Sequence, residues 1–260
     1  MKPNTSNVEF LCSATQTTLR GRFVIPSSGF GSPTTRIPLV IMLTGDSPKG
    51  TKSLSWINLP PLLAEQGIAS FLFDFEGLGY SDGGRSSLTI SKGIQNFRSA
   101  FTFATGQSWV DVSRLAIFAS SFGATVALLT PDITNRACLL GLKSPASFLA
   151  EAYLNECGDE EADKWISEGS SAKLGYSLEV LSDSLNYNVF HAAKQITRPV
   201  LITHGNRDTI VPLYQSKLLV SCLSGPKQLE VFEGVGHNYS EEGAWNRMAD
   251  IFSKWFSKNL

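Results

Sequence analysis

The sequence predicts an α/β protein with a mostly parallel, eight-stranded sheet flanked by helices and interrupted by one long insertion. Short apolar runs, such as residues 37–43 and 137–142, have the continuous hydrophobicity of strands that are covered on both faces. Stretches with helical spacing alternate with these runs, which is typical of parallel β-α-β units. With 260 residues, the chain is long enough to bury a large core.

The chain begins with a predicted antiparallel hairpin. Residues 8–14 and 18–26 each have the pattern of a strand, and residues 15–17 read as a hairpin connection. Residues 27–36 are rich in Ser, Gly and Pro and predict a loop, after which residues 37–43 predict a central strand. We therefore expect an antiparallel entry into the sheet.

The β-α-β alternation is established after this strand. Residues 54–66 predict a helix that ends at Gly67, and residues 68–75 predict a buried strand. Residues 91–105 predict a second helix.

Residues 74–84 form a dense turn between this strand and helix. The turn contains glycines at positions 77 and 79, but a dinucleotide site needs Gly-x-Gly-x-x-Gly opening directly into a helix. No helix is expected before about residue 89, so we predict no nucleotide site here. Asp74 and Asp82 are interpreted as turn-forming carboxylates.

The chain is organised around an abrupt change from strand to helix. Residues 115–118 predict a buried strand, and residues 123–129 are small and apolar enough to form a helix packed tightly on a sheet. Pro131 is expected to close this helix. Almost nothing lies between the two elements.

Ser121 occupies this strand-to-helix turn. Such a turn holds one residue in a strained conformation and needs small neighbours, which Ala119 and Gly123 provide. The turn exposes a hydroxyl beside the unpaired N–H groups that begin the helix, so a nucleophile and an anion site come together. The alternative is that Ser120 and Ser121 only cap the helix.

Residues 145–198 break the alternation and predict an inserted lid. This stretch is too long for a plain loop in a compact domain, so we expect it to have structure of its own. The core then comprises residues 1–144 and 199–260. Spaced aromatic residues in the lid can line a substrate pocket or form a small core within the lid, and these are Phe148, Tyr153, Trp165, Tyr176, Tyr187 and Phe190.

The sheet resumes after the lid. Residues 199–203 and 228–232 predict strands, residues 213–222 predict the helix between them, and an amphipathic helix is expected around residues 245–256.

Asp208 and His237 each follow one of these last two strands, so in a parallel sheet they lie on the same edge as Ser121. A serine hydroxyl needs an imidazole to take its proton and a carboxylate to hold that imidazole in the right tautomer. His204, at the end of a strand, is expected to orient the loop, and His191 lies in the lid. We therefore predict that Ser121, His237 and Asp208 act together.

Two backbone N–H groups are candidates for stabilising an oxyanion. One is that of Phe122, next to Ser121, and the other is that of Asp46, in the glycine turn after the strand at residues 37–43. The alternative for this second segment is an ordinary tight turn. We expect the Asp46 side chain to turn away, because a carboxylate aimed at an oxyanion opposes its charge.

The composition argues against several classes of partner. The 22 Lys and Arg residues balance 23 Asp and Glu, so no strong field favours nucleic acid or an anionic membrane. No run approaches the length of a membrane span, no secretory signal is evident, and the four cysteines are scattered. We expect a soluble, cytoplasmic protein, as a monomer or a homodimer, that acts on a small molecule without a metal or organic cofactor.

Four segments together resemble the α/β-hydrolase superfamily over nearly the whole chain, and these are residues 74–83, 119–123, 204–212 and 236–237. The order Ser, Asp, His along the chain is also the order found in that superfamily. The resemblance is greatest to capped esterases, which include bacterial cinnamoyl and feruloyl esterases, and to serine aminopeptidase-like hydrolases. It implies an α/β-hydrolase fold with an inserted lid.

These features predict a serine hydrolase that cleaves carboxylic esters. Ser121 is expected to attack the acyl carbon, His237 to take and return the proton, and Asp208 to orient His237, after which water resolves the acyl-enzyme. Thioesterase, amidase, aminopeptidase and acyltransferase activities can use the same three residues. A non-catalytic relative that binds a ligand or protein through the lid is the alternative of another class.

Overall fold

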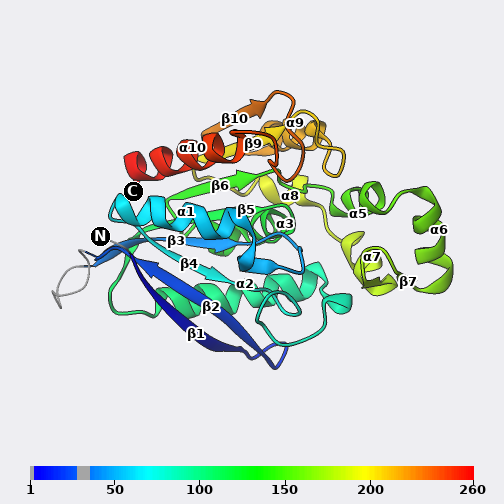
Figure 1. The fold of residues 1–260 in the computed structure, drawn as a ribbon, viewed down its shortest axis with the longest axis horizontal. Coiled ribbons are helices and arrows are strands. Elements are labelled where there is room, and N and C mark those ends of the chain that lie inside the picture. Colours follow the sequence, from blue (N-terminus) through cyan, green and yellow to red (C-terminus); the bar gives the residue numbers. More distant parts are fainter. Residues whose placement is uncertain (1–2, 28–35) are drawn as a thin grey trace.

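The computed structural model describes residues 3–27 and 36–260. The predicted loop at residues 27–36 thus lies almost entirely outside the described residues. Figure 1 shows a twisted sheet that crosses the molecule, helices on both of its faces, and the segment between the sixth and ninth strands projecting from one end. No helix in the described residues is long and apolar enough to cross a membrane.

Eight of the described strands form one sheet in the order β1-β2-β4-β3-β5-β6-β9-β10, and β7 and β8 form a separate pair. β2 pairs with both β1 and β4 in antiparallel orientation, and every pair from β4 to β10 is parallel. The predicted fold class is confirmed. The strands are β1 (Asn4–Cys12), β2 (Thr17–Ile25), β3 (Ile37–Leu43), β4 (Ala69–Phe73), β5 (Val110–Ser120), β6 (Leu139–Lys143), β9 (Val200–Gly205) and β10 (Lys227–Phe232).

Helices cover both faces of the sheet, which separates two hydrophobic cores. One face carries α1 (Leu54–Glu65) and α10 (Ala244–Asn259), which pack against each other and against the sheet. The other face carries the remaining core helices, which are α2 (Ile90–Thr105), α3 (Phe122–Leu128), α4 (Pro131–Thr134) and α9 (Leu213–Cys222). This two-sided covering explains why the central strands are apolar at consecutive positions.

β5 illustrates how sequence and packing agree. Ile117 and Ala119 belong to one core, whereas Phe118 points into the other. The Phe118 ring lies 5.5 Å from that of Trp56 and 4.7 Å from that of Phe252, between centroids. Burying a side chain of this size contributes about 1.5–3 kcal/mol, so both faces of β5 hold the sheet to its helices.

Several boundaries differ from the prediction, and β1 spans Asn4–Cys12 rather than residues 8–14. β5 begins at Val110, five residues earlier than expected, because Val110 pairs with Ile37 of β3, and residues 111–114 form an irregular stretch before Leu115 pairs with Leu39. That stretch has exposed positions, so it lacks the apolar run from which the strand was predicted. Pro131 is the first residue of α4, where its fixed φ and missing N–H are tolerated, rather than only the end of the preceding helix.

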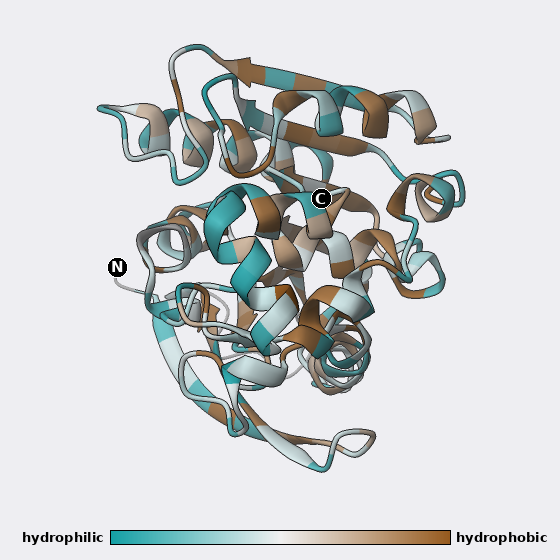
Figure 2. Ribbon diagram, turned by 90° about the vertical axis from the view of Figure 1, so that its right-hand side faces the viewer, coloured by the Kyte–Doolittle hydropathy of each residue, from teal (hydrophilic) through white to brown (hydrophobic). Residues whose placement is uncertain are grey.

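Residues 145–198, here called the inserted segment, have their own secondary structure. The segment contains α5 (Leu149–Cys157), α6 (Asp159–Glu168), the short strands β7 (Ser170–Ser171) and β8 (Tyr176–Ser177), α7 (Leu178–Ser184) and α8 (Val189–Ala193). In Figure 2 the segment faces the viewer, and its helices carry hydrophilic residues beside hydrophobic ones.

Three aromatic residues of the inserted segment pack together. Tyr153, Trp165 and Tyr176 are buried, with ring centroids 5.3 to 6.3 Å apart. Phe148 is instead 42% exposed. The three buried rings are continuous with the core on one face of the sheet, so they do not form a separate core within the segment.

Candidate active site

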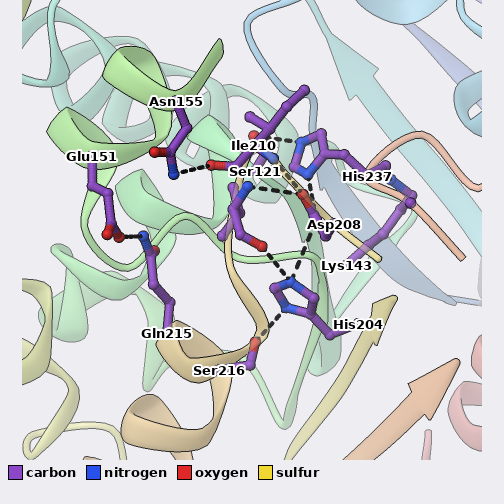
Figure 3. Close-up of polar contacts among 12 residues, drawn as sticks. Ser121, Lys143, Glu151, Asn155, His204, Asp208, Ile210, Gln215, Ser216 and His237 are labelled. Carbon is purple, nitrogen blue, oxygen red and sulfur yellow. Dashed lines mark hydrogen bonds and ion pairs between the residues drawn. The ribbon is translucent and has the colours of Figure 1, made fainter. Parts of the chain in front are cut away.

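The predicted site residues meet at the carboxyl edge of the parallel strands. Ser121 follows β5, Asp208 follows β9 and His237 follows β10. Figure 3 shows their side chains pointing toward one another. The convergence follows from topology, because the carboxyl ends of parallel strands lie on one edge of the sheet.

Ser121 has a strained backbone, with φ 50° and ψ −117°. Its N–H donates to the Lys143 carbonyl at 3.1 Å, which fixes the turn to the end of β6. A Cβ on Gly123 would lie 2.4 Å from the Thr44 carbonyl oxygen and 2.6 Å from that of Leu43. Only glycine lets α3 begin this close to β3, so the small residue noted in the sequence has a steric reason.

The His237 ring bridges the other two side chains. Its Nδ1 lies 2.7 Å from Asp208 Oδ2, and its Nε2 lies 3.2 Å from Ser121 Oγ. An ionised carboxylate can only accept, which assigns the proton to Nδ1. Nε2 is then free to accept the hydrogen of the serine hydroxyl.

Asp208 is buried and bound on both oxygens. Its Oδ1 accepts from the N–H groups of Ile210 at 3.0 Å and Val211 at 2.8 Å. Burial alone raises the pKa of this carboxyl, but hydrogen bonds from His204, His237 and the Val211 N–H outweigh it and hold the pKa well below its usual range. The group is therefore a carboxylate throughout the neutral pH range.

His204 fixes the Asp208 loop, as the sequence predicts. The ring is fully buried, with Nε2 2.8 Å from the Val211 carbonyl and 3.3 Å from Asp208 Oδ2, and Nδ1 2.7 Å from Ser216 Oγ. Because a carbonyl only accepts, Nε2 carries a proton. His204 thus joins the loop to α9.

The turn after β3 lies beside the serine. A Cβ on Gly45 would be 3.4 Å from Ser121 Cβ. Phe122 is the first residue of α3, so its N–H has no acceptor within the helix. Both segments predicted to carry oxyanion donors therefore flank Ser121.

The Asp46 side chain is held by the inserted segment. Its Oδ2 accepts from the Tyr176 hydroxyl at 2.8 Å, and its carbonyl accepts from Arg85 Nε at 3.1 Å. The Arg85 guanidinium also lies 4.2 Å from the centre of the Tyr176 ring and donates to the Leu174 carbonyl. The Asp46 carboxylate, which would oppose an oxyanion if it pointed toward one, is thus hydrogen-bonded to Tyr176.

The other noted carboxylates are structural. Asp74 accepts from the N–H groups of Thr51 at 2.6 Å and Tyr80 at 3.0 Å, and Asp82 pairs with Arg20. A pocket of about 430 Å³ beside this turn contains none of the predicted site residues. In residues 3–27 and 36–260, no group of three or more His, Cys, Asp or Glu is arranged to hold a metal ion.

Comparison with protein families identifies the chain. The model described as the prolyl oligopeptidase family matches residues 58–260, which include Ser121, Asp208 and His237. The chain belongs to the prolyl oligopeptidase family. It is therefore a hydrolase, and the resemblance noted in the sequence is confirmed at this level.

Relatives of this family member include proteins without an assigned activity. An uncharacterized protein of Mycobacterium tuberculosis is 30% identical over 221 residues, which cover 85% of this chain and 69% of the relative. A polyketide transferase of Penicillium crustosum, claH, is 30% identical over 140 residues, which cover 52% of this chain and 42% of the relative.

Solved structures share the fold at low identity. Est1E from Butyrivibrio proteoclasticus, with bound ferulic acid, has a TM-score of 0.79 and 18% identity over 97% of this chain and 98% of its own. The α/β-hydrolase GrgF from Penicillium sp. sh18 has a TM-score of 0.75 and 20% identity, covering 98% of each chain. This family member therefore has the α/β-hydrolase fold.

Sequence reasoning missed Lys143. Its side chain is buried, and its Nζ donates to the His237 carbonyl at 2.9 Å (Figure 3). The signal was present, since a lysine ends an otherwise apolar strand at the edge where the site was expected.

Proposed function

We propose that this member of the prolyl oligopeptidase family hydrolyses carboxylic esters of small molecules through an acyl-enzyme on Ser121. The observation that carries the proposal is the pair of contacts that His237 makes, Nε2 at 3.2 Å from the Ser121 hydroxyl oxygen and Nδ1 at 2.7 Å from Asp208 Oδ2. A nucleophile, a base and an orienting carboxylate in this arrangement are what acyl transfer to serine requires.

The proposed reaction has two halves. In the first, His237 Nε2 takes the proton of Ser121 as Oγ attacks the acyl carbon, and then gives it to the departing alcohol. In the second, His237 takes a proton from water as the water oxygen attacks the acyl carbon, and then returns that proton to Ser121 Oγ as the acid is released. Asp208 stays ionised and stabilises the imidazolium that forms in each half.

The N–H groups of Phe122 and Asp46 are the proposed oxyanion donors. They belong to two segments on either side of Ser121, and the start of α3 adds the positive end of a helix dipole. We propose that the inserted segment acts as a lid over this site. Its contact with Asp46 through Tyr176 connects it directly to the donor loop.

The test is hydrolysis of a p-nitrophenyl short-chain ester by purified variants. Ser121→Ala is expected to reduce kcat by at least about 10³-fold while the protein stays folded, because the nucleophile is lost. Ser120→Ala, which removes the neighbouring hydroxyl, is the matched control and is expected to retain activity. Turnover by Ser121→Ala equal to that of the unaltered protein would exclude the proposal.

Amide hydrolysis is the second candidate, and the family match favours it. The same residues can cleave an amide if His237 protonates the leaving amine. Matched ester, thioester and amide substrates with aromatic and aliphatic acyl groups separate these activities. We expect the highest kcat/KM for an ester, and a higher value for the amide would replace esterase with amidase as the assigned activity.

A further inference from the structure

Lys143 is a buried cation at the end of a central strand. It is the last residue of β6 and lies opposite Ser120 of β5 and Thr203 of β9 in the sheet register. Only 4% of the residue is exposed. Lysines are almost never this buried unless paired, so its contacts call for an explanation.

Two contacts of the Lys143 ammonium involve the loop that carries His237. Nζ donates to the His237 carbonyl at 2.9 Å and lies 4.6 Å from the centre of the Tyr239 ring. Tyr239 has a positive φ of 54°, so the loop is strained just after the histidine. A strained loop keeps its conformation only where its surroundings fix it.

The ionisable groups around Lys143 are Asp208, His204, His237 and Tyr239. Burial lowers the pKa of Lys143 to about 8, and the nearby Asp208 carboxylate partly opposes this effect. Burial also raises the pKa of the Tyr239 hydroxyl, which is therefore neutral. His204 is held by hydrogen bonds to Ser216 and Val211. Asp208 is then the negative charge that faces the ammonium.

Stability does not explain this lysine. A lowered pKa means that the fold disfavours the charged form, and burying an ammonium is often less favourable than burying an apolar side chain of the same size. A methionine would fill a similar volume without that penalty. The lysine is better explained by what its N–H groups and charge do for the site.

We propose that the ammonium of Lys143 is a positioning group that fixes the His237 loop and thereby holds the imidazole between Ser121 and Asp208. This inference rests on the proposed function. The positive charge has a second effect, because it disfavours protonation of the nearby imidazole and so keeps His237 in the form that accepts a proton.

Lys143→Met tests the proposal, because it removes both the charge and the donor at nearly constant volume. Lys143→Gln keeps a donor without the charge and is the second variant if the first does not fold. Lys227→Met is the matched control, since Lys227 also donates to a backbone carbonyl, that of Leu223 at 2.8 Å, but from the amino end of β10.

The measurements are kcat, KM and the pH profile of kcat/KM for ester hydrolysis. Lys143→Met is expected to reduce kcat about 10- to 100-fold with KM changed by less than about threefold, because a displaced base slows the chemical step. The acid limb of its profile is expected to shift to higher pH, because loss of the cation makes the imidazole easier to protonate. Lys227→Met should match the unaltered protein.

Two results would overturn the proposal. One is activity of Lys143→Met within about threefold of the unaltered protein across the pH range. The other is a lower kcat with an unmoved acid limb, which would indicate a merely structural role.

An NMR titration of the His237 ring in both proteins distinguishes this inference from the proposed function, because it requires no turnover. If the unaltered protein cleaves no ester, the proposed function fails. The ring titration then still tests the inference. An upward shift of its midpoint in Lys143→Met supports the inference, and an unchanged midpoint overturns it.

Discussion

Strained backbone conformations are concentrated around the candidate site. Of the described non-glycine residues, four have positive φ, and three of these border the site: Ser121 at 50°, Ser144 at 41° and Tyr239 at 54°. Each such conformation costs about 1–3 kcal/mol and persists only where the surroundings fix it. Here the carboxyl ends of β5 and β6 and the loop after β10 provide those surroundings.

Gly123→Ala tests how tightly this turn is packed. The added Cβ would collide with the carbonyl oxygens of Leu43 and Thr44, at 2.6 and 2.4 Å. We expect a loss of about 1–3 kcal/mol in the free energy of unfolding by urea denaturation, together with a lower kcat as the Phe122 N–H moves.

Gly84→Ala is the control for this substitution. Its nearest neighbour would be Ser86 Oγ at 3.6 Å, and its φ of −114° suits any residue. A change of less than about 0.5 kcal/mol is expected. If the two variants were equally stable, an added Cβ at position 123 would fit without a collision, which would contradict the structure.

Sequence patterns were informative about residues whose local context is distinctive. Ser121 lies between small residues at a strand-to-helix change, and Asp208 and His237 follow apolar runs, so each could be proposed from its neighbours. Lys143 could not be assigned a role in this way. Its partner is the backbone of a residue 94 positions away, and only the parallel register of the sheet brings the two together.

The inserted segment is tied to the core beside the proposed oxyanion loop. Tyr176 holds the Asp46 carboxylate, and Arg85 contacts both residues. Burial, with the charge of Asp46, raises the pKa of the Tyr176 hydroxyl well above its ordinary value, so the phenol is a neutral donor. The contact therefore persists across the pH range of activity assays.

Tyr176→Phe tests this connection. Without the phenol, the Asp46 carboxylate is free to turn toward the developing oxyanion and oppose its charge, so kcat is expected to fall about tenfold. Adding Asp46→Asn should recover most of that loss, because the amide carries no charge. A double variant as slow as Tyr176→Phe would contradict this explanation.

Tyr187→Phe is the control. It removes a different contact between the inserted segment and the core, the 2.7 Å hydrogen bond between Tyr187 and Ser91 Oγ. We expect kcat to change by less than about twofold, because this contact does not involve the Asp46 loop.

Elements differed in how well they could be predicted. Strands buried on both faces, such as β3 and β4, are continuous apolar runs and were located from them. The helices of the inserted segment have at most ten residues, and α6 buries only Trp165. Such short helices contain too few turns for a hydrophobic period to locate them. The length of the insertion predicted only that it has secondary structure of its own.

At the scale of the whole molecule, the sheet separates two cores and brings charge to one edge. The buried ammonium at that edge makes stability depend on alkaline pH. The pKa of Lys143 is about 8 in the folded protein and about 10.4 when unfolded. Between these pH values the unfolded chain binds more protons than the folded protein does. The contribution of Lys143 to the free energy of unfolding therefore rises with pH over this range and is lost as the pH falls back to about 8.

Urea denaturation of the unaltered protein and Lys143→Met at several pH values measures this effect. The difference between them isolates Lys143 from other titrating groups. Between pH 8 and 10.5, the free energy of unfolding of the unaltered protein is expected to rise relative to that of Lys143→Met by up to about 3 kcal/mol. A difference that stays constant over this range would show that the lysine is not buried as a titrating ammonium.

The most direct test of the account is intact-mass and peptide analysis after treatment with a fluorophosphonate. The serine nucleophile must be activated by His237 for this reagent to react quickly. We predict one adduct, on Ser121, that forms rapidly in the unaltered protein and at least about 10²-fold more slowly in His237→Ala. Failure to label Ser121, or labelling that does not depend on His237, would contradict the proposed acyl chemistry.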